Sequence, residues 1–139
     1  MKRLNKKGFT LIELLAVIVI LAVVMVVTIP SVLKSMDAAR QGQLDNAVKT
    51  IEDYVNKNYE LCNMEGVLAT TGYDSSIFTE NTCTPLTDDT IIKKAGYSTT
   101  DIPSITGAIN NTTNKYVITK VNNGTELTTG KFKGATYSK

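Results

Sequence analysis

Residues 8–13, Gly8-Phe9-Thr10-Leu11-Ile12-Glu13, lead directly into LLAVIVILAVVMVV, an unbroken apolar run over residues 14–27. Residues 9–33 are mostly apolar, and as a helix they exceed the roughly 20 residues needed to cross a bilayer. No later segment is comparably apolar, so the sequence predicts one membrane-spanning helix. The preceding basic residues are expected to stay cytoplasmic, which sends the chain after residue 34 outward; they are Lys2, Arg3, Lys6 and Lys7.

Glu13 is the unusual residue of this helix, because a carboxylate at bilayer depth costs about 2.5 kcal/mol or more. A cleaved secretory signal would have a shorter apolar stretch and a small-residue cleavage site after it, and residues 30–37 offer none. A plain signal anchor fits the hydropathy but gives no role to Glu13 or to the Gly8-Phe9 junction. A functional carboxylate with a specific partner explains both features.

The sequence Lys-Lys-Gly-Phe-Thr-Leu-Ile-Glu at residues 6–13 closely resembles the class III signal of type IV pilins and pseudopilins. The resemblance covers about the first thirty residues and includes the basic leader, Gly8, the aromatic Phe9 and Glu13. It implies that prepilin peptidase removes residues 1–8 by cutting between Gly8 and Phe9, and that the new amino terminus of Phe9 is N-methylated. Residues 9–33 then anchor the subunit and later form the filament core, and residues 34–139 form an extracellular domain.

Cleavage would place a cationic amine on Phe9, four residues before Glu13. Pairing Glu13 with this amine, above all with that of a neighbouring subunit, would recover much of the cost of the buried charge. Such a pair would also set the axial register between subunits, a known use of buried polar groups. We therefore predict an assembly and register role for Glu13.

Pro30 lies in the apolar segment at a position where many pilins carry a proline. Proline lacks the N–H of a helical residue and its ring clashes with the carbonyl four residues earlier. We expect a helix break at Pro30, with an extensible or melted stretch over residues 22–30. The family often has a Gly within this stretch, whereas this chain has Ala and β-branched residues.

Beyond the membrane, apolar residues recur at three- and four-residue spacing and predict a continued helix to about Cys62, which would be roughly 80 Å long from Phe9. This stripe comprises Leu33, Met36, Leu44, Ala47, Val48, Ile51, Val55 and Tyr59, and the opposite face carries Lys49, Glu52, Asp53, Asn56 and Lys57.

The stripe needs a partner, which residues 63–139 should provide as one α+β domain with a small antiparallel sheet, the pilin fold. We predict strands over residues 116–121, 126–129 and 131–137, with the first hairpin turning at Asn122-Asn123-Gly124. A short helix is expected over residues 87–95, closed by Gly96.

Cys62 and Cys83 are the only cysteines, and both fall on the outward side. An even cysteine count in an oxidising compartment predicts a disulfide, worth about 3 kcal/mol for a loop of this length. Two free thiols are the alternative in a strict anaerobe without disulfide catalysts.

Enzymatic and cofactor functions find no support, so we predict no enzyme activity, no cofactor and no metal. The chain has no His, which excludes His-based triads and His-ligated zinc, and it has no glycine-rich phosphate loop. Four acidic residues could attract calcium but show no loop pattern, and a solvated acidic surface explains them better; they are Asp74, Glu80, Asp88 and Asp89.

Charge does not indicate nucleic acid as a partner of the single subunit. Removing the four leader cations from fifteen basic residues leaves eleven against thirteen acidic ones, so the basicity belongs to the leader. A lysine cluster that could attract DNA in a filament is better explained as a solvated sheet edge; it comprises Lys115, Lys120, Lys131, Lys133 and Lys139.

The sequence thus favours a major type IV pilus subunit that forms a homopolymer after passing through the cytoplasmic membrane of a bacterium. The resemblance implies an assembly ATPase and a membrane platform protein as partners, and use of the surface filament in adhesion, motility, biofilm formation or DNA uptake. The alternative is the major pseudopilin of a type II secretion or competence system. A membrane-anchored binding module, a third reading, predicts an uncleaved start.

Overall fold

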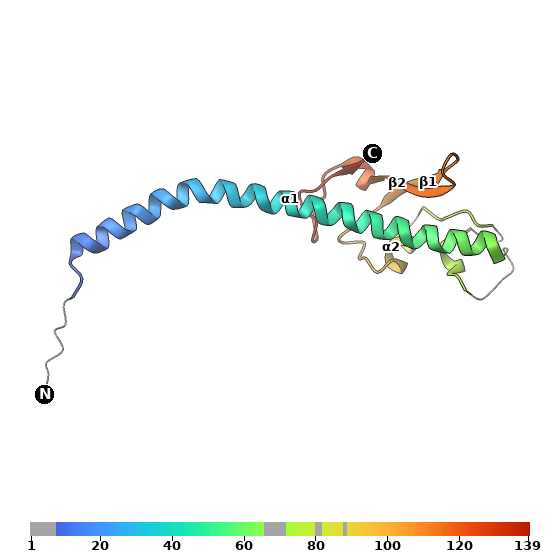
Figure 1. Cartoon of the computed structure of the whole chain (residues 1–139), viewed down its shortest axis with the longest axis horizontal. Helices are drawn as coiled ribbons and strands as arrows, with labels where there is room; N and C mark the ends of the chain where they lie inside the picture. The colour runs from blue at the N-terminus through green and yellow to red at the C-terminus, as the bar shows by residue number, and fades with distance from the viewer. Residues whose placement is uncertain (1–7, 66–71, 80–81, 88) are drawn as a thin grey trace, which may run out of the picture. The chain divides into compact units, whose positions relative to one another are not determined.

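The computed structural model describes residues 8–65, 72–79, 82–87 and 89–139. Its contacts divide the chain into two units, Met1–Met36 and Asp37–Lys139. One helix, α1 (Leu11–Glu65), contributes residues to both units (Figure 1). The second unit adds the short helix α2 (Asp89–Lys94), two 3-10 turns and a three-stranded antiparallel sheet. The predicted α+β class, a long N-terminal helix with a small antiparallel sheet, is confirmed.

Helix α1 continues through Pro30, so the helix break predicted at this residue is wrong for the single chain. Melting over residues 22–30, which the resemblance implies for an assembled filament, stays a prediction. A single proline removes only one helical hydrogen bond, the one to the carbonyl of Val26, and the neighbouring turns keep theirs. The Thr28 hydroxyl adds a bond by donating to the Val24 carbonyl oxygen at 3.0 Å. The helix therefore tolerates this proline.

The apolar stripe of α1 forms the core of the second unit, as the three- and four-residue spacing predicts. Leu44, Ala47, Val48, Ile51 and Val55 are all buried. They pack in one cluster with residues from the loops, α2 and the sheet; the largest of these are Ile77, Phe78, Ile91, Ile92, Ile102, Tyr116, Ile118, Leu127 and Phe132. The first two positions of the predicted stripe, Leu33 and Met36, belong to the other unit and stay exposed.

The sheet has the order β1-β2-β3, formed by β1 (Ile105–Asn110), β2 (Lys115–Val121) and β3 (Tyr137–Ser138). Strands β1 and β2 make a hairpin in which Asn110 pairs with Lys115, and the register shifts between Thr106 and Gly107. The Asn110 side chain closes this turn because its Oδ1 accepts from the backbone N–H groups of Thr112 and Thr113, at 2.8 and 3.2 Å. Strand β3 pairs only with the end of β2.

Strand β2 confirms the strand predicted over residues 116–121, but the hairpin predicted at Asn122-Asn123-Gly124 is wrong. These three residues have φ values of 48°, 56° and 80° and form a 3-10 turn. A two-residue hairpin turn would use only two left-handed residues, and the third turns the chain away from β2. No strand forms over residues 126–129, where Leu127 is buried instead, and the strand predicted over 131–137 shrinks to β3.

Helix α2 confirms the helix predicted within residues 87–95, with tighter bounds. Ile91 and Ile92 bury its apolar face, and Lys93 lies 3.4 Å from Asp89 one turn earlier. Gly96 follows with φ at 88°, the left-handed conformation in which glycine commonly ends a helix. Helix α2 is thus short: its last residue is Lys94, and Gly96 two residues later turns the chain away.

Polar side chains of α1 hydrogen-bond to the backbone of the sheet. The Asn56 side chain accepts from the Tyr116 N–H at 2.7 Å and donates to the Tyr116 carbonyl at 3.0 Å. Glu52 accepts from the Ile118 N–H at 2.7 Å, and Gln41 makes the same two-way pairing with the backbone of Thr136. The sequence placed Glu52 and Asn56 opposite the apolar stripe but did not predict these bonds, through which they and Gln41 act as hydrogen-bond partners for backbone groups of residues 116, 118 and 136.

We expect Asn56→Ala to lower the free energy of unfolding of the second unit by about 2 kcal/mol, because it leaves a backbone N–H and C=O of Tyr116 unpaired. Urea unfolding of the full chain in detergent, followed by the near-ultraviolet circular dichroism of its tyrosines, measures the loss. Lys57→Ala alters the adjacent, exposed position of α1 and should change stability by less than about 0.5 kcal/mol. Equal effects of the two substitutions would contradict the pairing.

Asp74 fastens the loop after α1 to both helices. Its carboxylate accepts from the Tyr54 hydroxyl of α1 at 3.0 Å and lies 3.2 Å from Lys94 of α2. Its backbone N–H donates to Asn58 at 2.8 Å. Burial raises the pKa of Asp74, but hydrogen bonds from Ser76, Tyr54 and Lys94 outweigh burial and lower the pKa to about 2. The ionised carboxylate is therefore the form that the fold stabilises.

Because the folded pKa of Asp74 lies below the ordinary value of 3.8, its stabilising contribution should be complete above that pH and disappear as the pH falls toward about 2. We expect Asp74→Asn to remove this contribution, so that the variant loses less stability than the wild type between pH 4 and pH 2. Asp53→Asn, at an exposed position on α1, is the matched control. Unfolding midpoints across this pH range provide the measurement, and parallel curves for wild type and Asp74→Asn would refute the assignment.

Candidate processing and assembly site

The predicted cleavage site lies outside the helix. Gly8, Phe9 and Thr10 precede α1, which begins at Leu11, and the Phe9 side chain is 91% exposed. A protease needs an accessible backbone at the bond that it cuts, and a helical carbonyl would already be hydrogen-bonded. The Gly8-Phe9 junction has this open geometry, and cleavage there stays a prediction.

Glu13 and Thr10 form a reciprocal cap at the start of α1. The Thr10 backbone N–H and hydroxyl both donate to Glu13 Oε2, at 2.9 and 3.0 Å. In return the Glu13 N–H donates to the Thr10 hydroxyl at 3.3 Å. This is a capping box, in which a Thr at the N-cap and a Glu three residues later satisfy each other's free donors.

The sequence reasoning missed this cap, although its signal was present. A Ser or Thr followed three residues later by an acidic residue, directly before an apolar run, is the pattern of a capping box. Thr10-Leu11-Ile12-Glu13 has this pattern. Glu13 thus has a hydrogen-bond partner within its own chain, in addition to the amine that the sequence analysis predicts for it.

The apolar half of α1 has no partner within the structure. Every large apolar side chain from Phe9 to Met36 is at least 46% exposed. By length and composition, α1 is the one helix of the described residues that could cross a membrane. Such a surface is far larger than soluble monomers tolerate, so it requires lipid or further protein chains around it.

The family model for the prokaryotic N-terminal methylation motif matches residues 3–29. The chain carries the class III signal of type IV pilins and pseudopilins. Comparison with curated proteins finds no match, and neither does comparison with solved structures.

The class III signal spans the whole candidate site, from the basic leader through Gly8, Phe9 and Glu13 to the last turn before Pro30. It implies processing by prepilin peptidase and assembly as a pilin or pseudopilin. Pilins and pseudopilins, whose signal this is, are structural proteins.

The acidic residues considered for calcium do not form a metal site among the residues that the structure describes. Asp74 is engaged by Tyr54, Ser76 and Lys94, and Glu80 and Asp88 lie outside the described residues. Two members of the lysine cluster have acidic neighbours, because Lys131 lies 3.8 Å from Asp101 and Lys139 lies 4.0 Å from Glu52.

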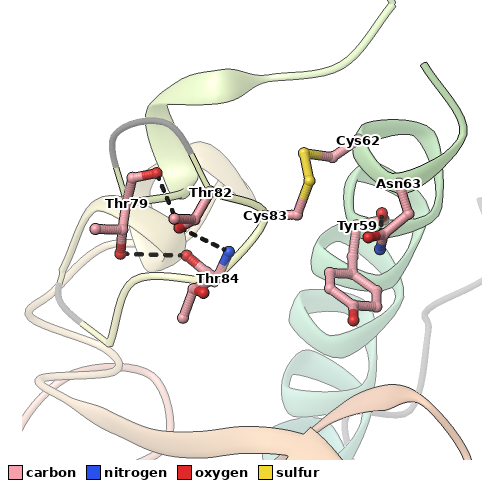
Figure 2. The surroundings of a disulfide bond; sticks show 7 residues. All are labelled: Tyr59, Cys62, Asn63, Thr79, Thr82, Cys83 and Thr84. Carbon is pink, nitrogen blue, oxygen red and sulfur yellow. Dashed lines mark hydrogen bonds between the residues drawn. A yellow bond between two sulfur atoms is a disulfide. The ribbon is translucent and has the colours of Figure 1, made fainter. Parts of the chain in front are cut away.

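Cys62 and Cys83 form a disulfide in the structure, as the compartment argument predicts (Figure 2). Cys62 is buried near the C-terminal end of α1, and Cys83 comes from a loop whose Thr side chains bond to its own backbone. Figure 2 shows this hydrogen-bonded loop beside the helix end, with the sulfur bridge between them. The disulfide therefore holds the loop against the end of α1.

We expect the double substitution Cys62→Ala and Cys83→Ala to lower the free energy of unfolding by about 3 kcal/mol, because the cross-link restricts the unfolded chain. Thermal unfolding of the double variant and of the wild type, each with and without reductant, provides the measurement. Reductant should destabilise only the wild type. Labelling of two free thiols in untreated wild-type protein would contradict the cross-link.

Proposed function

We propose that this chain is the major structural subunit of a type IV pilus, cleaved after Gly8 and polymerised through residues 9–33 into a surface filament. The observation that carries the proposal is the class III signal directly ahead of an exposed apolar helical segment with a single carboxylate near its start. Pilins and pseudopilins share this motif, so the proposal goes beyond the motif in naming a pilus and not a pseudopilus.

The exposed apolar surface supports a two-stage path. Residues 9–33 would first lie in the cytoplasmic membrane, and an assembly ATPase with a membrane platform protein would then transfer the subunit into the filament. Packing against other copies replaces lipid contacts by protein contacts, so the helix stays out of water throughout. In the filament, Glu13 would pair with the methylated amine of Phe9 from a neighbouring copy and fix the axial register.

The second unit supports an external role for residues 34–139. The Cys62–Cys83 disulfide fits the oxidising outer side of the membrane. Adhesion, motility, biofilm formation and DNA uptake are the uses proposed for the filament, and each would act through the surface of this domain.

We expect mass analysis of subunits purified from the native host to find Phe9 as the first residue, carrying one N-methyl group. Gly8→Val, which places a β-branched side chain at the scissile bond, should leave the leader attached while preserving membrane insertion. Electron microscopy of wild-type cells should show long surface filaments that a tagged copy of this chain labels along their length.

Three outcomes would contradict parts of this proposal. An intact Met1 start would indicate a membrane-anchored binding module. Methylated Phe9 with only short fibres within the cell envelope would indicate a pseudopilin. Labelling confined to the filament tip would rule out a major subunit.

A further inference from the structure

The two hydrogen bonds from Thr10 reach the same carboxylate oxygen of Glu13. Both the backbone N–H and the hydroxyl donate to Oε2, and Oε1 accepts no hydrogen bond from any described residue. A carboxylate has two oxygens with about four acceptor positions, so the capped Glu13 keeps half of its capacity. The cap therefore occupies one side of the group and leaves the other available.

We infer that Thr10 is a positioning residue for assembly: it holds Glu13 by Oε2 so that Oε1 can accept the ammonium group of a neighbouring subunit. This inference rests on the proposed function, because the ammonium group exists only after cleavage before Phe9. It assigns Thr10 a role that acts entirely through Glu13.

Preorganisation is the first reason for this role. A free Glu side chain loses rotamer entropy when it is fixed, and this loss opposes binding. The capping box fixes Glu13 within the subunit, so this loss occurs before two subunits meet. Binding that needs no further ordering of its groups is tighter for the same contacts.

Charge is the second reason. Before assembly, Glu13 lies in a helix whose neighbouring side chains are apolar, and an ionised carboxylate there needs hydrogen bonds. The two donors of Thr10 supply them, so Glu13 can remain ionised in the membrane-held subunit. It then meets a cationic amine as a charge partner instead of a neutral acid.

The test measures how tagged variant subunits enter filaments of untagged wild-type subunits in the same cells. Thr10→Val keeps the shape of the side chain and removes the hydroxyl, and we expect it to enter about tenfold less than wild type, which corresponds to one hydrogen bond to a charged group. Thr10→Ser restores the hydroxyl and should enter as wild type does. Membrane levels and N-methylation of Phe9 are measured for each variant, so that only processed, inserted subunits are compared.

A double-mutant cycle with Glu13→Gln separates positioning from helix capping. If Thr10 acts through Glu13, Thr10→Val should cause little further loss in the Glu13→Gln background. An undiminished tenfold effect in that background would mean that Thr10 only caps the helix, and would overturn the inference.

The remaining outcomes distinguish the two proposals. If Glu13→Gln enters filaments poorly but Thr10→Val enters as wild type, the role of Thr10 is wrong and the proposed function stands. If Glu13→Gln itself enters as wild type, the pairing of Glu13 with the amine is wrong, and the role of Thr10 fails with it.

Discussion

The structure depends on one helix that must satisfy two environments. The first part of α1 carries apolar side chains on all sides, and the part within Asp37–Lys139 carries them along one stripe. The first pattern needs an apolar surrounding on every side, whereas the second needs a single packing partner. The sheet, α2 and the loops of the second unit are that partner, and their largest apolar residues all pack on this stripe.

Periodicity made the helix and its core predictable. Leu44, Ala47, Val48, Ile51 and Val55 could be identified from spacing alone, because burial on a helix follows a period of 3.6 residues. Strand β2 was also predicted, from its alternating apolar residues, and helix α2 was predicted from Gly96, a residue type that commonly follows the end of a helix. The motif at residues 6–13 was readable because charge, glycine, aromatic and carboxylate coincide at fixed positions.

The hairpin was not predictable from the same signals. Asn122-Asn123-Gly124 has the composition of a tight turn, but three left-handed residues in succession turn the chain elsewhere. The true hairpin turn at Asn110 depends on one side chain bonding to the backbone two and three residues later. Local composition did not distinguish the two turns, because tertiary packing of residues such as Leu127 decides between them.

The polar side chains of α1 escaped prediction for a related reason. Glu52 and Asn56 have the composition of a solvated helix face, and nothing in their spacing reveals that a strand lies within reach. The same holds for the capping box, whose pattern of two residues is short and easily passed over within a longer motif. Hydrogen bonds between elements depend on tertiary geometry, whereas an apolar stripe can be recognised from the spacing of residues along the sequence.

The bonds from Gln41, Glu52 and Asn56 to the sheet also bear on how copies of this chain meet at high local concentration. An open strand edge offers unpaired backbone groups to any other chain and is a common origin of aggregation. On the β2 side, α1 and the C-terminal strand occupy the backbone groups of Tyr116, Ile118 and Thr119. Another copy could pair there only by displacing bonds that already exist. This edge of β2 is thereby insulated from neighbouring chains.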